Sequence, residues 1–167
     1  MILISSGDNR TTCMTSFTVL GDERSEGFSI LCDGKEYIKV VRKAVWFDIT
    51  SKFYLKDQLV LESVLQDKIF WLEIAIIRQK LEHHITVSKK NGHYYLQYGD
   101  NTLSFNTRIF RNPYGKIFKN NEQIGEITVF QGIAVRPSKF DFTFYEDDDL
   151  NYYSVLLFIM CLPIRSS

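Results

Sequence analysis

The sequence predicts a mainly β protein, a closed antiparallel β-barrel of about 10–12 strands that encloses one hydrophobic C-terminal α-helix. Three observations lead to this prediction. Among 167 residues there are 13 Phe, 9 Tyr and 2 Trp, and such side chains favour the half-buried surface of a sheet. Short extended runs alternate with turn signals through most of the chain. Every residue from 155 to 162 is apolar, so a helix there must be enclosed on all sides.

The beginning of the chain, residues 1–16, is expected to be a loose lead-in to a single domain over residues 17–164. Ser, Gly, Asp and Asn cluster in the lead-in, and Met14 could itself be the start of the chain. The first residues show no basic leader, no long apolar run and no small-residue cleavage site, so we do not expect a secretory signal. A reducing, cytoplasmic setting is the resulting expectation.

The first clear hairpin is expected around Asp33-Gly34, a strong signal for a two-residue turn. Residues 28–32 would form the strand before this turn and residues 36–42 the strand after it. Further short strands are then expected over residues 46–49, 52–56 and 58–64.

Residues 69–82 allow two interpretations. Glu, Lys, Gln and Leu in this segment are good helix formers, which would suit an amphipathic helix. The apolar run around Trp71, Ile74, Ile76 and Ile77 would equally suit a pair of buried strands. We favour strands, because no N-cap box opens the segment, no glycine closes it, and strand-like residues follow it.

The second half continues with short extended runs separated by turn signals such as Asn91-Gly92. In the last run, Phe140, Phe142 and Phe144 share one face, as alternation in a strand requires. The runs expected as strands are residues 85–88, 93–98, 102–105, 108–111, 116–119, 123–130, 133–136 and 139–145.

The terminal helix is expected over about residues 149–163. Three acidic residues, Asp147, Asp148 and Asp149, precede it, as the positive end of a helix dipole prefers, and Pro163 stops it. The apolar run is shorter than the roughly 20 residues that a membrane span needs. We therefore expect a core helix inside a closed sheet, which would also remove exposed strand edges.

Three segments carry a resemblance to a known group: YIKVVRK at residues 37–43, KFYLKD at residues 52–57 and GKIFKNNEQIGEI at residues 115–127. With the apolar terminal helix, they resemble the Tubby C-terminal-like superfamily, and in particular its small bacterial members. That group also includes tubby proteins, phospholipid scramblases and plant LURP-one-related proteins. The resemblance covers roughly residues 17–164 and implies a closed antiparallel barrel around a hydrophobic C-terminal helix.

Charge and cysteine usage narrow the function classes. Lys and Arg number 20, and so do Asp and Glu, so no net charge draws the protein to nucleic acid or to an anionic membrane. The three cysteines, Cys13, Cys32 and Cys161, are odd in number and scattered, which fits neither a disulfide framework nor a metal site.

No cofactor, metal or enzymatic activity is expected. His83 and His84 are adjacent, so in a strand they would point to opposite faces, and His93 lacks metal-ligand spacing. The acidic run at residues 147–149 lacks the alternating ligands of a calcium loop. The chain also contains no nucleophile elbow, no P-loop and no dinucleotide-binding glycine pattern.

The candidate binding residues are Lys39, Arg42 and Lys43, which are expected on the outer face of the barrel. Arg42 is the best single candidate for gripping a phosphate, because a guanidinium can form two parallel hydrogen bonds. The alternative is a solvated strand face with interspersed charges. We expect a non-enzymatic binding or scaffold module that engages phospholipid head groups or a protein partner. The alternative function is a lipocalin-like carrier with a small apolar ligand inside the barrel.

Overall fold

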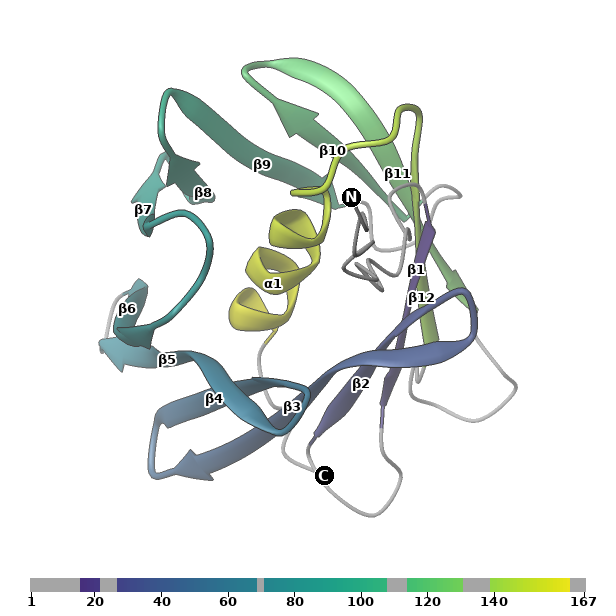
Figure 1. The fold of residues 1–167 in the computed structure, drawn as a ribbon. Helices are drawn as coiled ribbons and strands as arrows, with labels where there is room; N and C mark the ends of the chain where they lie inside the picture. Colours follow the sequence, from purple (N-terminus) through teal and green to yellow (C-terminus); the bar gives the residue numbers. More distant parts are fainter. Residues whose placement is uncertain (1–15, 22–26, 69–70, 108–113, 131–138, 163–167) are drawn as a thin grey trace, which may run out of the picture.

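The computed structural model describes residues 16–21, 27–68, 71–107, 114–130 and 139–162. Within these residues, twelve strands form one antiparallel sheet that curls round a single helix, α1 (Tyr152–Cys161), as Figure 1 shows. The strands are β1 (Ser16–Gly21), β2 (Phe28–Cys32), β3 (Lys35–Val45), β4 (Asp48–Leu55), β5 (Gln58–Lys68), β6 (Trp71–Gln79), β7 (Ile85–Lys90), β8 (His93–Tyr98), β9 (Asn101–Thr107), β10 (Gly115–Lys119), β11 (Glu122–Phe130) and β12 (Lys139–Phe144). The predicted fold class is confirmed.

The sheet is a barrel that is nearly, but not fully, closed. Its strand order is β6-β5-β4-β3-β2-β1-β12-β11-β10-β9-β8-β7, so the first strand pairs with the last and joins the two halves. The two ends of the sheet, β6 and β7, are consecutive in the chain, yet their backbones are not hydrogen-bonded to each other.

Alternation along the strands places the core as predicted. Phe140, Phe142 and Phe144 of β12 are all buried on one face. Inside the barrel, the ring of Phe158 on α1 lies 5.0 Å from the Phe140 ring and 5.1 Å from the Phe142 ring, centroid to centroid. Tyr153 to Met160 are all buried, so the expected core role of the helix is confirmed.

The helix is shorter than the expected range of residues 149–163. It begins at Tyr152, because the Asp148 carboxylate accepts the N–H of Leu150 at 2.9 Å and the Asp148 carbonyl accepts the N–H of Asn151 at 3.0 Å, which forms a turn. It ends at Cys161, and the next residue is extended. Residue 163 lies outside the described residues.

Tight turns join most neighbouring strands, and the one at Asp33-Gly34 is confirmed. Both of its residues have positive φ, as in a type I′ turn, whose twist matches that of the flanking strands. The predicted strand at residues 46–49 is wrong, because Trp46 and Phe47 form a turn. β4 then runs without a break from Asp48 to Leu55.

The ambiguous segment forms one strand, β6, so the strand interpretation is confirmed for residues 71–79 although two strands were expected. The ladder between β5 and β6 shifts register between Glu62 and Ser63, which leaves Ile77 outside the regular pairing. Ile77 is exposed for this reason, while Ile74 is buried. The predicted strands at residues 108–111 and 133–136, and nearly all of the lead-in, lie outside the described residues.

Candidate functional site

Arg42 faces the inside of the barrel and is only 6% exposed. Its Nε donates a hydrogen bond to Ser51 Oγ at 3.1 Å, and its Nη2 donates to the carbonyl oxygen of Leu162, just past the end of α1. The guanidinium carbon also lies 5.7 Å from the centroid of the Phe28 ring. The expectation that Arg42 lies on the outer face is therefore wrong. Alternation along β3 places Ile38, Val40 and Arg42 inward.

The other two predicted residues, Lys39 and Lys43, are exposed on the outer face of β3. Val41 and Val45 share that face and are 45% and 48% exposed. The structure thus brings Lys39 and Lys43 together with exposed apolar side chains and separates both from Arg42. The two-residue period of a strand was the signal that would have separated them.

The hairpin between β3 and β4 ends in a prominent apolar turn that sequence reasoning missed. Trp46 is 93% exposed and Phe47 is 72% exposed. Val45 pairs with Asp48, so these two aromatic residues are the whole loop. We call Val45, Trp46 and Phe47 the aromatic tip.

Trp46 has a φ of 59°, a left-handed conformation that costs a bulky residue about 1–2 kcal/mol. Phe47 is not among the residues with positive φ, so the turn has the φ pattern of type II′, which prefers Gly at its first position. The other positive-φ turns of the described chain use Asp, Asn, Gly or Lys. Trp46 is thus strained and exposed and Phe47 is exposed beside it, a combination that packing inside the barrel does not explain.

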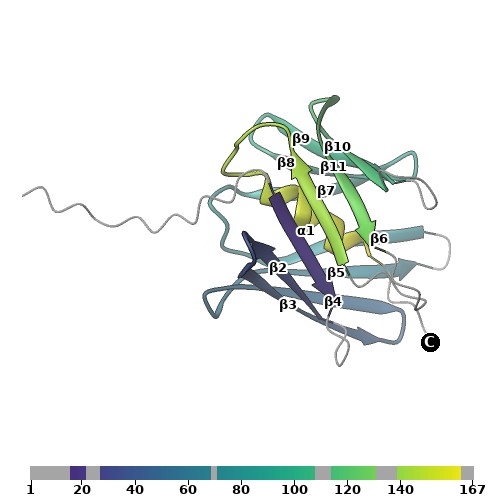
Figure 2. The same cartoon turned by 90° about the vertical axis from the view of Figure 1, so that its right-hand side faces the viewer.

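A third exposed aromatic residue lies at the same end of the barrel. Asp48 of β4 pairs with Gln66 of β5, and Lys68 at the end of β5 pairs with Trp71, which is 56% exposed. α1 also finishes towards this end of the barrel (Figure 2). Arg42, near the end of β3, accordingly bonds the carbonyl oxygen of Leu162. We call the aromatic tip and Trp71 together the aromatic rim. Among the described residues, the exposed charged side chains near the aromatic rim include Lys43, Asp48, Asp67, Lys68, Glu73, Lys89 and Lys90.

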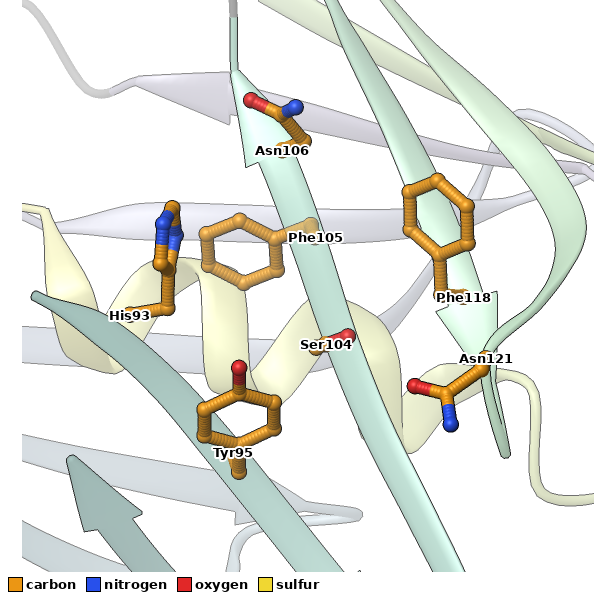
Figure 3. A pocket seen from close by; sticks show the side chains of 7 residues that line it. All are labelled: His93, Tyr95, Ser104, Phe105, Asn106, Phe118 and Asn121. Atoms are coloured by element: carbon orange, nitrogen blue, oxygen red, sulfur yellow. The ribbon is translucent and has the colours of Figure 1, made fainter. Parts of the chain in front are cut away.

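A shallow hollow of about 250 Å³ lies over β8, β9 and β10 (Figure 3). Ser104 pairs with Tyr95 on one side and with Phe118 on the other, so a small side chain stands between two aromatic ones. His93, Phe105, Asn106 and Asn121 complete the lining. The polar side chains of the lining are an imidazole, a phenol, a hydroxyl and two amides, and the lining contains no carboxylate and no thiol.

A larger hollow of about 520 Å³ lies where β6 and β7 face each other. Its lining residues are Trp71, Leu72, Glu73, Ile74, Val87, Ser88, Lys89 and Tyr94. We call this gap, with the side chains that bridge it, the β6–β7 seam. Burial raises the pKa of the Tyr94 hydroxyl to about 12, so this hydroxyl stays protonated and acts as a hydrogen-bond donor in the seam.

Two titratable groups near α1, Cys161 and Asp148, have structural roles. Burial raises the pKa of the Cys161 thiol, which keeps it in the unreactive protonated form at neutral pH. Asp148 accepts a hydrogen bond from Lys119 Nζ at 3.0 Å. Burial disfavours the Asp148 carboxylate, but the Leu150 N–H and Lys119 outweigh burial and lower its pKa.

The described residues contain no group of three or more His, Cys, Asp or Glu side chains placed to hold a metal ion. Within that part of the chain, no helix combines the length and the apolar character that spanning a bilayer requires.

Neither a family model, nor a curated protein, nor a solved structure matches this chain. The candidate sites are accordingly defined by the geometry of this chain alone: the aromatic rim with its lysines, the β6–β7 seam, and the hollow over β8 to β10.

Proposed function

We propose that the protein is a non-enzymatic binding module that docks on anionic phospholipid surfaces through its aromatic rim. One observation carries the proposal: Trp46, at the tip of the β3–β4 hairpin, is 93% exposed in a backbone conformation that a bulky residue adopts only at a cost. Phe47 beside it is 72% exposed, so the tip offers a compact apolar wedge.

A bilayer surface suits this wedge because Trp is favoured at the boundary between hydrocarbon and head groups. Lys43 lies two residues before the aromatic tip, and Lys39 lies further along the same outer face. A lysine near an anionic membrane surface contributes about 1 kcal/mol of attraction. With apolar side chains at the tip and lysines behind them, the hairpin would bury its rings while its charges meet lipid phosphates.

The rest of the molecule is in keeping with a rigid docking module. The interior that a lipocalin-like carrier would need for its ligand is occupied by α1, whose residues Tyr153 to Met160 are buried. Some tubby-type proteins bind phosphoinositide head groups, so the resemblance of this chain to that group makes anionic phospholipids the first ligands to test.

The test is co-sedimentation with vesicles of phosphatidylcholine alone and of phosphatidylcholine with phosphatidylserine. The wild type is expected to bind the anionic vesicles, and binding should weaken as salt rises above about 0.1 M. The double variant Trp46→Ala, Phe47→Ala should bind at least about tenfold more weakly, since burying each ring is worth about 1.5–3 kcal/mol. The double variant Lys39→Ala, Lys43→Ala should lose most of the preference for anionic lipid.

Matched controls are available on the same fold. Ile77 is an exposed apolar residue outside the aromatic rim, and Lys35 is an exposed lysine at the opposite end of β3. Ile77→Ala and Lys35→Ala should bind vesicles like the wild type. Equal binding by the wild type and by the Trp46→Ala, Phe47→Ala variant would contradict the proposal.

A further inference from the structure

The β6–β7 seam is the only place in the described sheet where two neighbouring strands are not joined by backbone hydrogen bonds. Figure 1 shows β6 and β7 facing each other as the two ends of the sheet. In an antiparallel sheet, the N–H and C=O of one residue point to the same side, and the side alternates along the strand. The open edges of β6 and β7 therefore direct backbone donors and acceptors into the gap.

At one end of the seam, the side chain of Gln79 takes the place of a strand. Its Oε1 accepts the N–H of Ile85 at 2.8 Å, and its Nε2 donates to the carbonyl oxygen of Ile85 at 3.0 Å. One primary amide thus makes both hydrogen bonds that a residue of a neighbouring strand would make. This bridge shows that the seam accommodates an added amide group between the two backbones.

At the other end, two side chains reach the carbonyl oxygen of Leu72: the Tyr94 hydroxyl at 3.0 Å and Lys89 Nζ at 3.3 Å. Because the Leu72 carbonyl faces the seam, alternation turns the backbone groups of Ile74 to the seam as well. On β7, the backbone groups of Ile85 face the seam, and those of Val87, two residues further on, face it as well. The backbones of Ile74 and Val87 thus face the gap between the two bridged ends.

Lys89 adds a charge to this pattern. It contacts a neutral carbonyl oxygen, and its Nζ lies 5.1 Å from the centroid of the Tyr94 ring. In the described part of the chain no carboxylate lies within ion-pair distance of Lys89, although Glu73 lines the same hollow. An occupant that brings a carboxylate to this end would therefore complement the site.

We propose that the β6–β7 seam binds an extended polypeptide segment of a partner protein, which adds a strand to the sheet and pairs a carboxylate with Lys89. Unpaired strand edges recognise the regular spacing of peptide groups, which other ligand classes do not offer. The apolar side chains of Leu72, Ile74 and Val87 would receive alternate side chains of the segment. The hollow of about 520 Å³ is within the range of 300–1,000 Å³ typical of ligand sites.

The test uses a phage-displayed library of random octapeptides as the probe, selected against the full chain. Enriched peptides should show alternating apolar residues and an acidic residue. Synthetic copies should bind in fluorescence anisotropy, and N-methylation of a residue that faces β6 or β7 should weaken binding about tenfold. Lys89→Met should also weaken binding about tenfold, whereas Lys90→Met, at the exposed neighbouring position, should leave it unchanged.

Bound peptide should shift the amide resonances of Leu72, Ile74 and Val87 and slow their hydrogen exchange. The seam shares Trp71 with the aromatic rim but does not include the aromatic tip, so the Trp46→Ala, Phe47→Ala variant should bind peptide like the wild type even if membrane docking fails. The proposal is overturned if selection enriches no peptide, if N-methylation has no effect, or if peptides shift only resonances of another surface.

Discussion

Arg42 places a permanent positive charge beside the end of α1, where a helix leaves carbonyl groups without intrahelical partners. Arg42→Met keeps most of the apolar stem but removes the donors to Ser51 and Leu162. Hydrogen bonds from charged groups contribute about 1.5–3 kcal/mol, and we expect the variant to lose that much unfolding free energy.

The measurement is urea unfolding of the full chain, with Lys43→Met as the control. Lys43 is exposed one residue further along β3, so its replacement should change the unfolding free energy by less than about 0.5 kcal/mol. Equal stability of the two variants would show that Arg42 does not hold the end of the helix.

Single residues also explain which turns the sequence could predict. Asp33-Gly34 and Asn91-Gly92 form turns as predicted, because these residue types adopt positive φ at little cost. Trp46 and Phe47 have none of this turn chemistry, and so the sequence predicted a strand there. The missed turn coincides with the proposed docking site, as expected where an interaction rather than folding explains the residues.

At the scale of elements, the turn before α1 depends on Asp148, which bonds Leu150 N–H and Lys119 on β10. Burial works against the carboxylate, but these donors hold its pKa below the ordinary value of 3.8. A lowered folded-state pKa stabilises the protein above the unfolded-state value, and this stability is lost as pH falls through the folded-state pKa. Asp148→Asn should therefore unfold more easily at pH 7 and depend less on pH in the acid range.

The effect at pH 7 should stay below about 1 kcal/mol, because both partners are partly exposed. Urea unfolding between pH 2 and pH 7 measures it. Asp147→Asn is the control, since Asp147 is exposed and its side chain is bonded to neither Lys119 nor Leu150. A parallel pH dependence of the wild type and Asp148→Asn would refute this role.

The ambiguity of residues 69–82 has a physical source at the same scale. The register shift between Glu62 and Ser63 interrupts the two-residue alternation near Ile76 and Ile77. Without clean alternation, a strand with Glu, Lys, Gln and Leu shares its pattern with an amphipathic helix. Pairing with β5 favours the strand over the helix for this segment. This pairing joins two segments of the chain, so the local sequence does not reveal it.

For the whole molecule, the sequence was sufficient for a barrel around a helix because an all-apolar terminal run requires enclosure and repeated hairpins supply the sheet. The sequence alone did not predict the aromatic rim or the β6–β7 seam. The aromatic rim depends on hairpins that meet at one end of the barrel through register, such as the Asp48–Gln66 pair. The seam exists because β6 and β7 do not pair through their backbones. No residue pattern in the sequence predicts that these two strands stay unpaired.

At the β6–β7 seam, side chains join the two strands in place of backbone hydrogen bonds. Gln79 makes two of these side-chain hydrogen bonds. Gln79→Ala removes both hydrogen bonds to Ile85 without changing an apolar core residue. We expect amide hydrogen exchange to become at least about tenfold faster along β6 and β7, since two hydrogen bonds of about 0.5–1.5 kcal/mol each are lost. Amides of β1 and β12, which pair with each other at the far side of the sheet, should keep their protection. Gln97→Ala, on an exposed position of β8, should alter neither region. If Gln79→Ala lowered protection uniformly over the sheet, the bridge would contribute only to global stability, and the seam would not be a separate site of opening.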